Sequence, residues 1–217
     1  MGRTATWTIV VAMTAVASQA AAAEPELGDS GHFTLSAERL FGYAHSTTGT
    51  TIAGGVEVTD SSDSFTLFTS PLSGEATRYG WPRIAFDAFV ARGFSVGGAL
   101  GIVHVAPDDG DSITGFIVAP RAGYAARLGS RLWIWPRLGF TYTQLSTNPN
   151  GAGADITATA YALTAEVPFA ISVAPRVLLH LGPTFDLGLG GSTSAGGLSV
   201  DSSTNDFGVY AGLAIVL

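Results

Sequence analysis

Apolar and polar residues alternate along two adjoining runs in the middle of the chain, 113–128 and 131–145, which Gly129-Ser130 separates. The apolar parity includes Phe116, Val118, Tyr124, Leu128, Leu132, Ile134, Leu138 and Phe140. The opposite parity carries Ile117, Ala119, Arg121, Gly123, Ala125, Arg127, Trp133, Trp135, Arg137, Gly139, Thr141 and Thr143. Because strand side chains point to alternate faces, the pattern predicts a β-hairpin with one apolar face and one mainly small or polar face. Water-soluble sandwiches alternate too, so parity alone does not say which face is outside.

The same alternation predicts eight strands. They are Gly31–His45, Trp81–Ala91, Phe94–Val105, Ile113–Leu128, Arg131–Leu145, Ile156–Val173, Arg176–Gly190 and Asn205–Leu217. Long polar loops are expected after His45, Val105, Leu145 and Gly190, and turns of about two residues at Arg92, Gly129 and Ala174. Long loops at one end and short turns at the other are typical of an outer-membrane barrel, with its loops outside the cell and its turns in the periplasm. A β-sandwich has no reason to keep that rule around the whole chain.

Two of the expected loops contain further predictions. The first, Ser46–Gly80, is interpreted as one long loop in which Thr51–Val58 and Ser64–Thr69 pair as a hairpin around Thr59–Asp63. The last, Gly191–Thr204, is interpreted as a polar loop rich in Ser, Thr and Gly.

Composition supports a membrane barrel. Of 217 residues only 12% are charged and 47% are apolar, with a mean hydropathy of +0.34. Yet the mature chain lacks the roughly 18–20 consecutive apolar residues that a membrane helix needs. Apolar character without a long apolar run is produced when apolar residues occupy alternate strand positions. The predicted fold is therefore all-β, an eight-stranded antiparallel up-and-down transmembrane β-barrel.

Charge and cysteine content exclude other classes. All ten basic residues are Arg, and the net charge is −7. A nucleic-acid-binding surface needs clustered Lys and Arg, so this class is excluded. Without Cys the chain has neither disulfides nor a thiolate metal site.

The first 23 residues have the pattern of a secretory signal peptide. Arg3 precedes an apolar core, and an alanine run, 20–23, precedes Glu24-Pro25. Signal peptidase accepts small residues before the cut, so we place cleavage after Ala23. The alternative is an N-terminal membrane anchor. Residues 24–30 would then form a short lead and residues 31–217 the barrel.

Aromatic residues on the apolar parity fall into two groups. Toward the loop ends lie Tyr43, Phe116, Phe140, Tyr142, Tyr161, Phe185 and Phe207, and toward the turn ends lie Phe33, Phe94, Tyr124 and Phe169. Two such groups are expected to form the interfacial girdles of a membrane barrel. The apolar face is therefore predicted to contact lipid, and the small-or-polar face to line the interior.

A Pro-Arg unit recurs in three strands, at Pro82-Arg83, Pro120-Arg121 and Pro136-Arg137, each followed by an apolar, a small and an aromatic residue. Proline removes a ladder hydrogen bond, so bulges are expected nearby. Arg39 breaks the pattern because it falls on the apolar parity. Either a bulge near Glu38-Arg39 turns it inward, or it snorkels to an interface.

The inward parity collects a set of charged residues. It comprises Glu38, Arg83, Asp87, Arg121, Arg137, Glu166, His180 and Asp186. An eight-stranded barrel is just wide enough for side chains to fill, and buried charges must be paired. Three arginines face four carboxylates, which leaves His180 to share the fourth acid. A structural salt-bridge network is the main interpretation, and a narrow proton or ion path and a catalytic carboxylate site are the alternatives.

Other candidate sites are weak. His45-Ser46 resembles a base and a nucleophile, but adjacent strand residues point to opposite faces. The four histidines show no metal-ligand spacing. Asp108-Asp109-Gly110-Asp111 lacks the spacing of a calcium loop and is interpreted as solvated loop acidity. We therefore expect no catalytic residue, no cofactor and no metal.

These features resemble the small eight-stranded outer-membrane barrels, the class of the OmpA membrane domain and OmpX. The strongest local match is the last strand, where Gly212, Ile215 and Leu217 resemble the terminal pattern that the barrel assembly machinery recognises. That pattern usually ends in an aromatic residue and has a polar residue before the glycine, whereas here these are Leu217 and Ala211. The charged interior also resembles the Arg–carboxylate cluster of that class.

Two groups of barrel enzymes match less well. Lipid A deacylases carry His, one residue, then Ser, whereas His45 is followed at that spacing by Thr47, and His32 by Thr34. Omptin-type proteases have ten strands, and the pattern here predicts eight.

The sequence thus favours a non-enzymatic integral outer-membrane protein of the Gram-negative envelope, acting in envelope integrity or in surface interaction through long acidic loops. Alternatives are an outer-membrane enzyme that modifies lipid, and a narrow conductance pore. Expected partners are outer-membrane lipid, lipopolysaccharide and the assembly machinery, and the sequence names no extracellular ligand.

Overall fold

The computed structural model describes residues 26–52, 55–67, 70–73, 80–105, 111–148 and 154–217. The predicted signal peptide, the Asp108-Asp109-Gly110 segment and most of the loop around 149–153 lie outside these residues. Among the described residues, no helix is long and apolar enough to cross a membrane. The strands are β1 (Phe33–Ile52), β2 (Val56–Leu67), β3 (Ser70–Ser73), β4 (Arg83–Ala91), β5 (Phe94–Val105), β6 (Ser112–Tyr124), β7 (Ala126–Arg127), β8 (Leu132–Ile134), β9 (Arg137–Asn148), β10 (Ile156–Glu166), β11 (Phe169–Ala174), β12 (Val177–Ala195) and β13 (Leu198–Val216).

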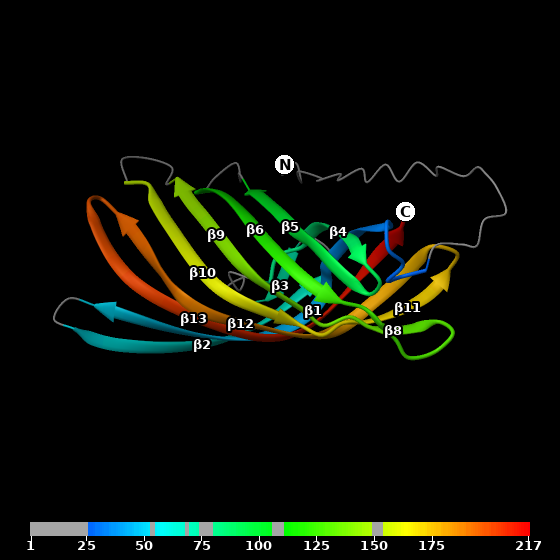
Figure 1. The fold of residues 1–217 in the computed structure, drawn as a ribbon. Helices are drawn as coiled ribbons and strands as arrows, with labels where there is room; N and C mark the ends of the chain where they lie inside the picture. The colour runs from blue at the N-terminus through cyan, green and yellow to red at the C-terminus, as the bar shows by residue number, and fades with distance from the viewer. Residues whose placement is uncertain (1–25, 53–54, 68–69, 74–79, 106–110, 149–153) are drawn as a thin grey trace, which may run out of the picture.

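The strands form a closed antiparallel barrel (Figure 1). Its ring runs β1–β4–β5–β6–β9–β10–β12–β13, and β13 pairs with β1 from Thr34↔Val216 to Thr51↔Asp201, which closes the sheet. Short β7, β8 and β11 continue β6, β9 and β10 at the turn end. The predicted eight-stranded barrel is therefore confirmed.

Proline residues explain why three ring strands are divided or weakened. Pro136 separates β8 from β9, and Pro168 separates β11 from β10. Pro120 lies inside β6, where the ladder to β9 skips from Val118↔Tyr142 to Arg121↔Gly139. Each proline lacks the N–H that a ladder needs, so pairing resumes on either side of it.

The hairpin that we predicted within the Ser46–Gly80 loop does form, but its strands and its turn were placed wrongly. Strand β1 continues to Ile52, the chain turns at Gly55, and β2 returns beside β1 from Ile52↔Val56 to Phe41↔Leu67. The turn therefore lies inside the segment that we expected to be a strand. Ser and Thr occupy both parities here, so no period of two is visible, although Thr suits extended backbone.

The predicted loop over Gly191–Thr204 is also wrong. Strands β12 and β13 continue as a hairpin until Ala195 pairs with Leu198. Gly196 and Gly197 form the two-residue turn, with φ of 56° and 84°. Positive φ at both positions is the requirement of a type I′ hairpin turn, and glycine meets it without steric cost.

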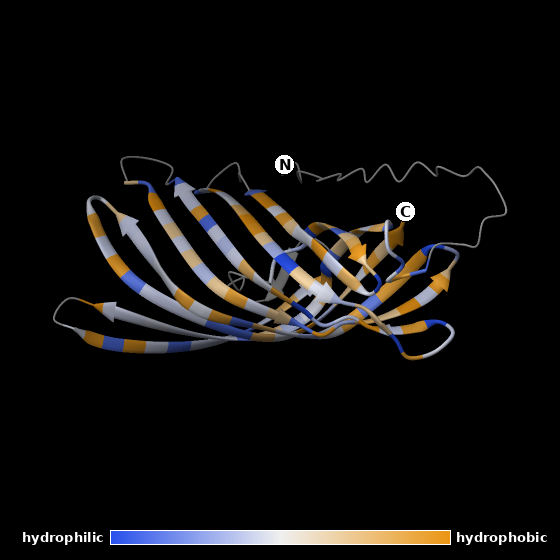
Figure 2. Ribbon diagram, in the orientation of Figure 1, coloured by the Kyte–Doolittle hydropathy of each residue, from blue (hydrophilic) through white to orange (hydrophobic). Residues whose placement is uncertain are grey.

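The outer wall of the barrel is apolar, as predicted (Figure 2). Exposed side chains there include Ile84, Phe86, Leu100, Ile102 and Leu138. By contrast, Arg83, Arg121 and Arg137 are buried inside the ring. This is the inside-out distribution that a lipid bilayer requires of a barrel that spans it.

Candidate functional site in the barrel interior

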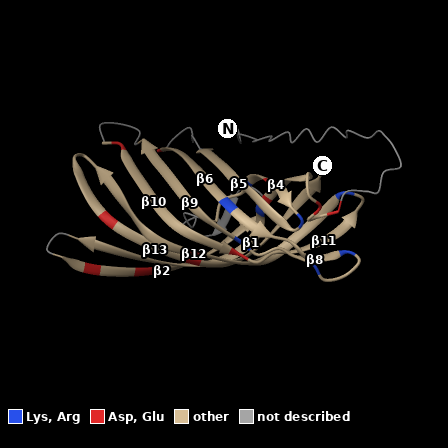
Figure 3. Cartoon of the chain, in the orientation of Figure 1, with Lys and Arg blue, Asp and Glu red and all other residues tan. Residues whose placement is uncertain are grey.

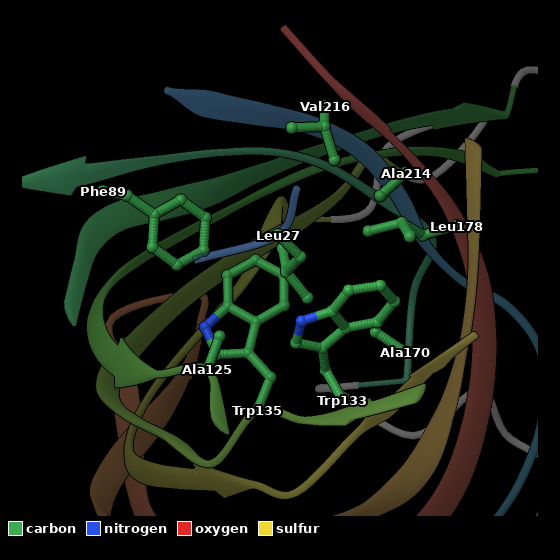
Figure 4. Close-up of a cluster of buried hydrophobic side chains, with 9 residues drawn as sticks. All are labelled: Leu27, Phe89, Ala125, Trp133, Trp135, Ala170, Leu178, Ala214 and Val216. Carbon is green, nitrogen blue, oxygen red and sulfur yellow. The ribbon is translucent and has the colours of Figure 1, made fainter. Parts of the chain in front are cut away.

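The interior is filled in three layers along the barrel axis. Nearest the turns lies an apolar cluster, shown in Figure 4, that consists of Leu27, Phe89, Ala125, Trp133, Trp135, Ala170, Leu178, Ala214 and Val216. Trp135 is only 1% exposed and packs against Phe89 with ring centroids 5.6 Å apart. Its indole N–H donates to the Ser95 hydroxyl over 3.1 Å. The alternation predicts that both tryptophans point inward, but not that they close this end.

The segment before β1 completes the apolar cluster. Leu27 enters it from residues outside the ring (Figure 4). The Gly93 N–H donates to the Gly28 carbonyl over 2.8 Å, and the Gly31 N–H donates to the Phe89 carbonyl over 2.8 Å. A salt bridge joins Glu26 to Arg127. The described part of the expected short lead, residues 26–30, therefore forms part of the barrel's closed end.

Above the apolar cluster lies a charged layer centred on Arg121. Its Nε and Nη2 donate to the two Asp87 oxygens over 3.0 and 2.6 Å. Its Nη1 and Nη2 also donate to the two Glu38 oxygens over 2.6 and 2.8 Å. Bidentate pairing to two carboxylates uses the planar fork of arginine fully, and all three side chains are buried.

Arg137 links this group to a further acid. Its Nη1 donates to Glu38 over 2.6 Å, and its Nη2 lies 2.9 Å from Glu166. Its guanidinium also stands over the Trp135 ring, 4.9 Å from the centroid. Trp135 therefore joins the apolar cluster to the charged layer.

Arg39 is the charged residue whose place the alternation left open. The β1–β13 register shifts between Ala37 and Phe41, and Arg39 has a φ of 54°, so the bulge is confirmed and interfacial snorkelling is wrong. The bulge turns Arg39 inward, where it donates to Glu166 over 3.1 Å and to Asp186 over 3.2 Å. Its guanidinium lies 4.9 Å from the Tyr210 ring centroid. The residue before it, Glu38, keeps its inward direction.

The expected sharing of the fourth acid by His180 is therefore corrected. Asp186 pairs with Arg39, and among the described residues no hydrogen bond joins His180 to an acid. The bulge turns a fourth arginine, Arg39, toward the interior, and Arg39 pairs with the acid that we expected His180 to share. Arg83 is buried in the same layer and lines a small cavity with Arg121 and Glu166.

Little free space remains in the charged layer. Two cavities beside it have volumes of about 10 Å³ and 20 Å³. A single water molecule needs about that much room. Because the carboxylates and guanidiniums neutralise one another at hydrogen-bond distance, their cost of desolvation is offset.

Hydroxyl groups line the interior toward the loops. Thr141 and Thr164 are 2.7 Å apart, Thr48 and Thr204 are 3.0 Å apart, and the Ser46 hydroxyl donates to Asp206. These side chains continue the inward parity of β1, β9, β10 and β13 toward the loop end.

A polar cluster lies on the described part of the outer wall, at the level of the aromatic residues of the loop end. His45 Nδ1 lies 2.9 Å from Asp63, and the Tyr43 hydroxyl donates to the same oxygen over 2.5 Å. These hydrogen bonds, first from Tyr43 and then from His45, lower the pKa of the exposed Asp63 carboxyl. Ser46 faces the interior instead, so His45 and Ser46 do not form a catalytic pair. Among the described residues no group of three or more His, Asp or Glu side chains is arranged so that it could hold a metal ion.

The last strand, β13, places the residues of the terminal pattern at the turn end. Gly212 faces inward against the His180 ring, and a Cβ there would approach that ring to 2.7 Å. Ile215 pairs with Leu35 and Val177, and the Leu217 N–H donates to the Phe33 carbonyl over 2.8 Å.

No protein-family model matches the sequence, and no curated protein matches it. Solved structures do. The outer membrane protein AlkL aligns with a TM-score of 0.52 at 13% identity, covering 93% of this chain and 97% of AlkL. OprG from Pseudomonas aeruginosa gives 0.51 at 11% identity, covering 87% and 96%. The chain has the fold of a small outer-membrane β-barrel. Neisserial surface protein A aligns at 0.49 and 16% identity, over 85% of this chain and 98% of that one.

Proposed function

We propose that the protein is a non-enzymatic integral barrel of the outer membrane that serves envelope integrity or surface interaction through its acidic loop end. The observation that carries the proposal is the filled interior. Arg39, Arg121 and Arg137 are tied to four carboxylates, and the apolar cluster closes the barrel below them. A barrel filled in this way has a structural core in place of a lumen.

The location in the outer membrane is supported by the outward apolar side chains and by the likeness in fold to AlkL and OprG. On this proposal residues 1–23 are removed on export, and the barrel contacts lipid and lipopolysaccharide. Gly212, Ile215 and Leu217 are the residues that the assembly machinery would recognise. The loop end faces outside the cell and the turn end faces the periplasm.

Planar-bilayer recording tests the closed interior. We expect the purified barrel to give no current steps. The Arg121→Ala variant should give none either, because the apolar cluster still closes the turn end. Steady conductance by the unmodified barrel, altered in size by Arg137→Gln, would support the narrow pore instead.

Mass spectrometry of lipid A tests the absence of enzymatic activity. His45 and Asp63 do meet on the outer wall at the loop end, which is the only specific support for a lipid-modifying enzyme in the described chain. We expect cells with the protein, without it, and with His45→Gln to show the same acyl pattern. An acyl change that depends on the protein and is lost in the His45 variant would overturn the proposal.

A further inference from the structure

Among the residues that the structure describes, the arginines outside the interior gather at the turn end of the barrel. Arg92 lies in the β4–β5 turn, Arg127 and Arg131 flank the β7–β8 turn, and Arg176 lies in the β11–β12 turn; all four are exposed. Neighbouring turns are joined through the backbone, because the Ser172 N–H of β11 donates to the Arg131 carbonyl over 2.9 Å. Three separate short connections thus present guanidinium groups at one end of the barrel.

The loop end has the opposite charge (Figure 3). Its described residues include no arginine, and its exposed acids are Glu57, Asp60, Asp63, Asp111, Asp155 and Asp201. At the turn end the described acids that are exposed are Glu26, which pairs with Arg127, and Asp29, which accepts the Glu26 N–H. Arg92, Arg131 and Arg176 form no ion pair with any described acid. Their charges are therefore available to a partner.

Each of these three arginines follows an exposed aliphatic residue on the outer wall. Val90 is 61% exposed and precedes Arg92 by two positions, while Leu128 and Val173 are 56% and 55% exposed and precede Arg131 and Arg176 by three. An exposed aliphatic side chain two or three positions before an exposed arginine suits a phospholipid, in which glycerol joins the acyl chains to the phosphate. Long cationic side chains reach such boundaries from the apolar wall. We name these six residues the turn-end rim: Val90, Arg92, Leu128, Arg131, Val173 and Arg176.

We propose that the turn-end rim binds the phosphate headgroups of anionic phospholipids in the leaflet that meets the barrel's turns. The aliphatic members favour a lipid over a free phosphate ion or a peptidoglycan carboxylate, because neither of those offers apolar surface. The exposed acids at the loop end repel anionic headgroups, whereas the arginines at the turn end attract them. Binding of anionic phospholipid is therefore expected in the leaflet that contacts the turns. The inference rests on the proposed function only in requiring a barrel that spans a bilayer.

Native mass spectrometry of the refolded mature barrel, with phosphatidylglycerol or phosphatidylcholine added to the micelles, tests this binding. We expect the unmodified barrel to retain phosphatidylglycerol preferentially. The Arg131→Gln, Arg176→Gln variant should lose about fivefold of that preference for each arginine replaced. The Arg131→Lys, Arg176→Lys variant should keep most of it, because lysine still contacts phosphate as a point charge.

The matched control removes two charges from the opposite end, Asp60→Asn with Asp201→Asn, and should leave the preference unchanged. An equal preference in the glutamine variant and the unmodified barrel would overturn the inference, as would displacement of the lipid by millimolar inorganic phosphate. Heat-dependent gel mobility of each sample shows separately that the barrel is folded. A chain that does not fold into a heat-modifiable barrel would therefore count against the proposed function. A folded barrel without a preference for phosphatidylglycerol would count against lipid binding by the turn-end rim and not against the proposed function.

Discussion

The apolar cluster and the charged layer lie next to each other inside one barrel, and both are almost completely buried. They differ in what each member requires. A residue of the apolar cluster only has to fill its space. Truncating it lowers the free energy of unfolding by an amount that depends on the cavity left behind. A residue of the charged layer requires its particular partners, because an acid that loses its arginine stays buried with an uncompensated charge. Similar burial therefore implies unequal tolerance to substitution, and the following experiments measure that difference.

The largest effect is expected for Arg121→Met. Methionine fills similar space, so the packing term is small, but Glu38 and Asp87 both lose charge-assisted hydrogen bonds. The free energy of unfolding should fall by about 3–5 kcal/mol. Urea unfolding of the barrel in lipid vesicles measures it.

A second variant shows whether the unpaired acid is the cause. Replacing Asp87 with Leu in the Arg121→Met background should recover part of the lost stability, because it removes an acid whose two oxygens both accept hydrogen bonds from Arg121. A double variant less stable than Arg121→Met would contradict the contrast between the two layers.

The next effect belongs to the apolar cluster. Leu178→Ala, at a residue 3% exposed, should lower the free energy of unfolding by about 2–3 kcal/mol through the cavity it creates. Leu138 on the outer wall is the matched control, since lipid replaces the lost contacts there. Equal losses at the two leucines, in the same urea titration, would show that the cluster is not tightly packed.

A smaller and local effect is expected outside both layers, in the β12–β13 hairpin. Gly196→Ala places a Cβ at a φ of 56°, which costs about 1 kcal/mol. Hydrogen exchange of amides near Ala195 and Leu198 should quicken, while amides beside Arg121 keep their rates. Faster exchange in the charged layer would show that the hairpin and the interior open together.

The smallest effect on stability is expected at the end of β13. Leu217→Phe restores the aromatic residue of the terminal pattern on an exposed position and should change the free energy of unfolding by less than about 0.5 kcal/mol. If the assembly machinery recognises this strand, the variant should assemble faster with purified machinery. An unchanged rate would leave Gly212 and Ile215 as the residues to test in that role.

The sequence predicts the wall of the barrel well and its extensions poorly. Within the bilayer one face of each strand must be apolar, so the alternation shows both the strands and the inward direction of Arg83 or Arg121. Toward the tip of the β1–β2 hairpin Ser and Thr occupy both faces of the strands, so the period disappears and the strands look like a loop. Arg39 shows a second limit: the sequence allows two positions for its side chain, and only the pairing of β1 with β13 decides between them.

The β2 strand creates a risk of self-association that its own sequence offsets. Strand β2 pairs with β1 on one side, but on the other side β3 covers it only from Phe65 to Leu67, so in the described part of the chain Val56–Ser64 is an open sheet edge. An open edge is a template for a strand from another molecule. Glu57, Asp60 and Asp63 place three negative charges along it, so a second copy that approached edge to edge would meet its own charges.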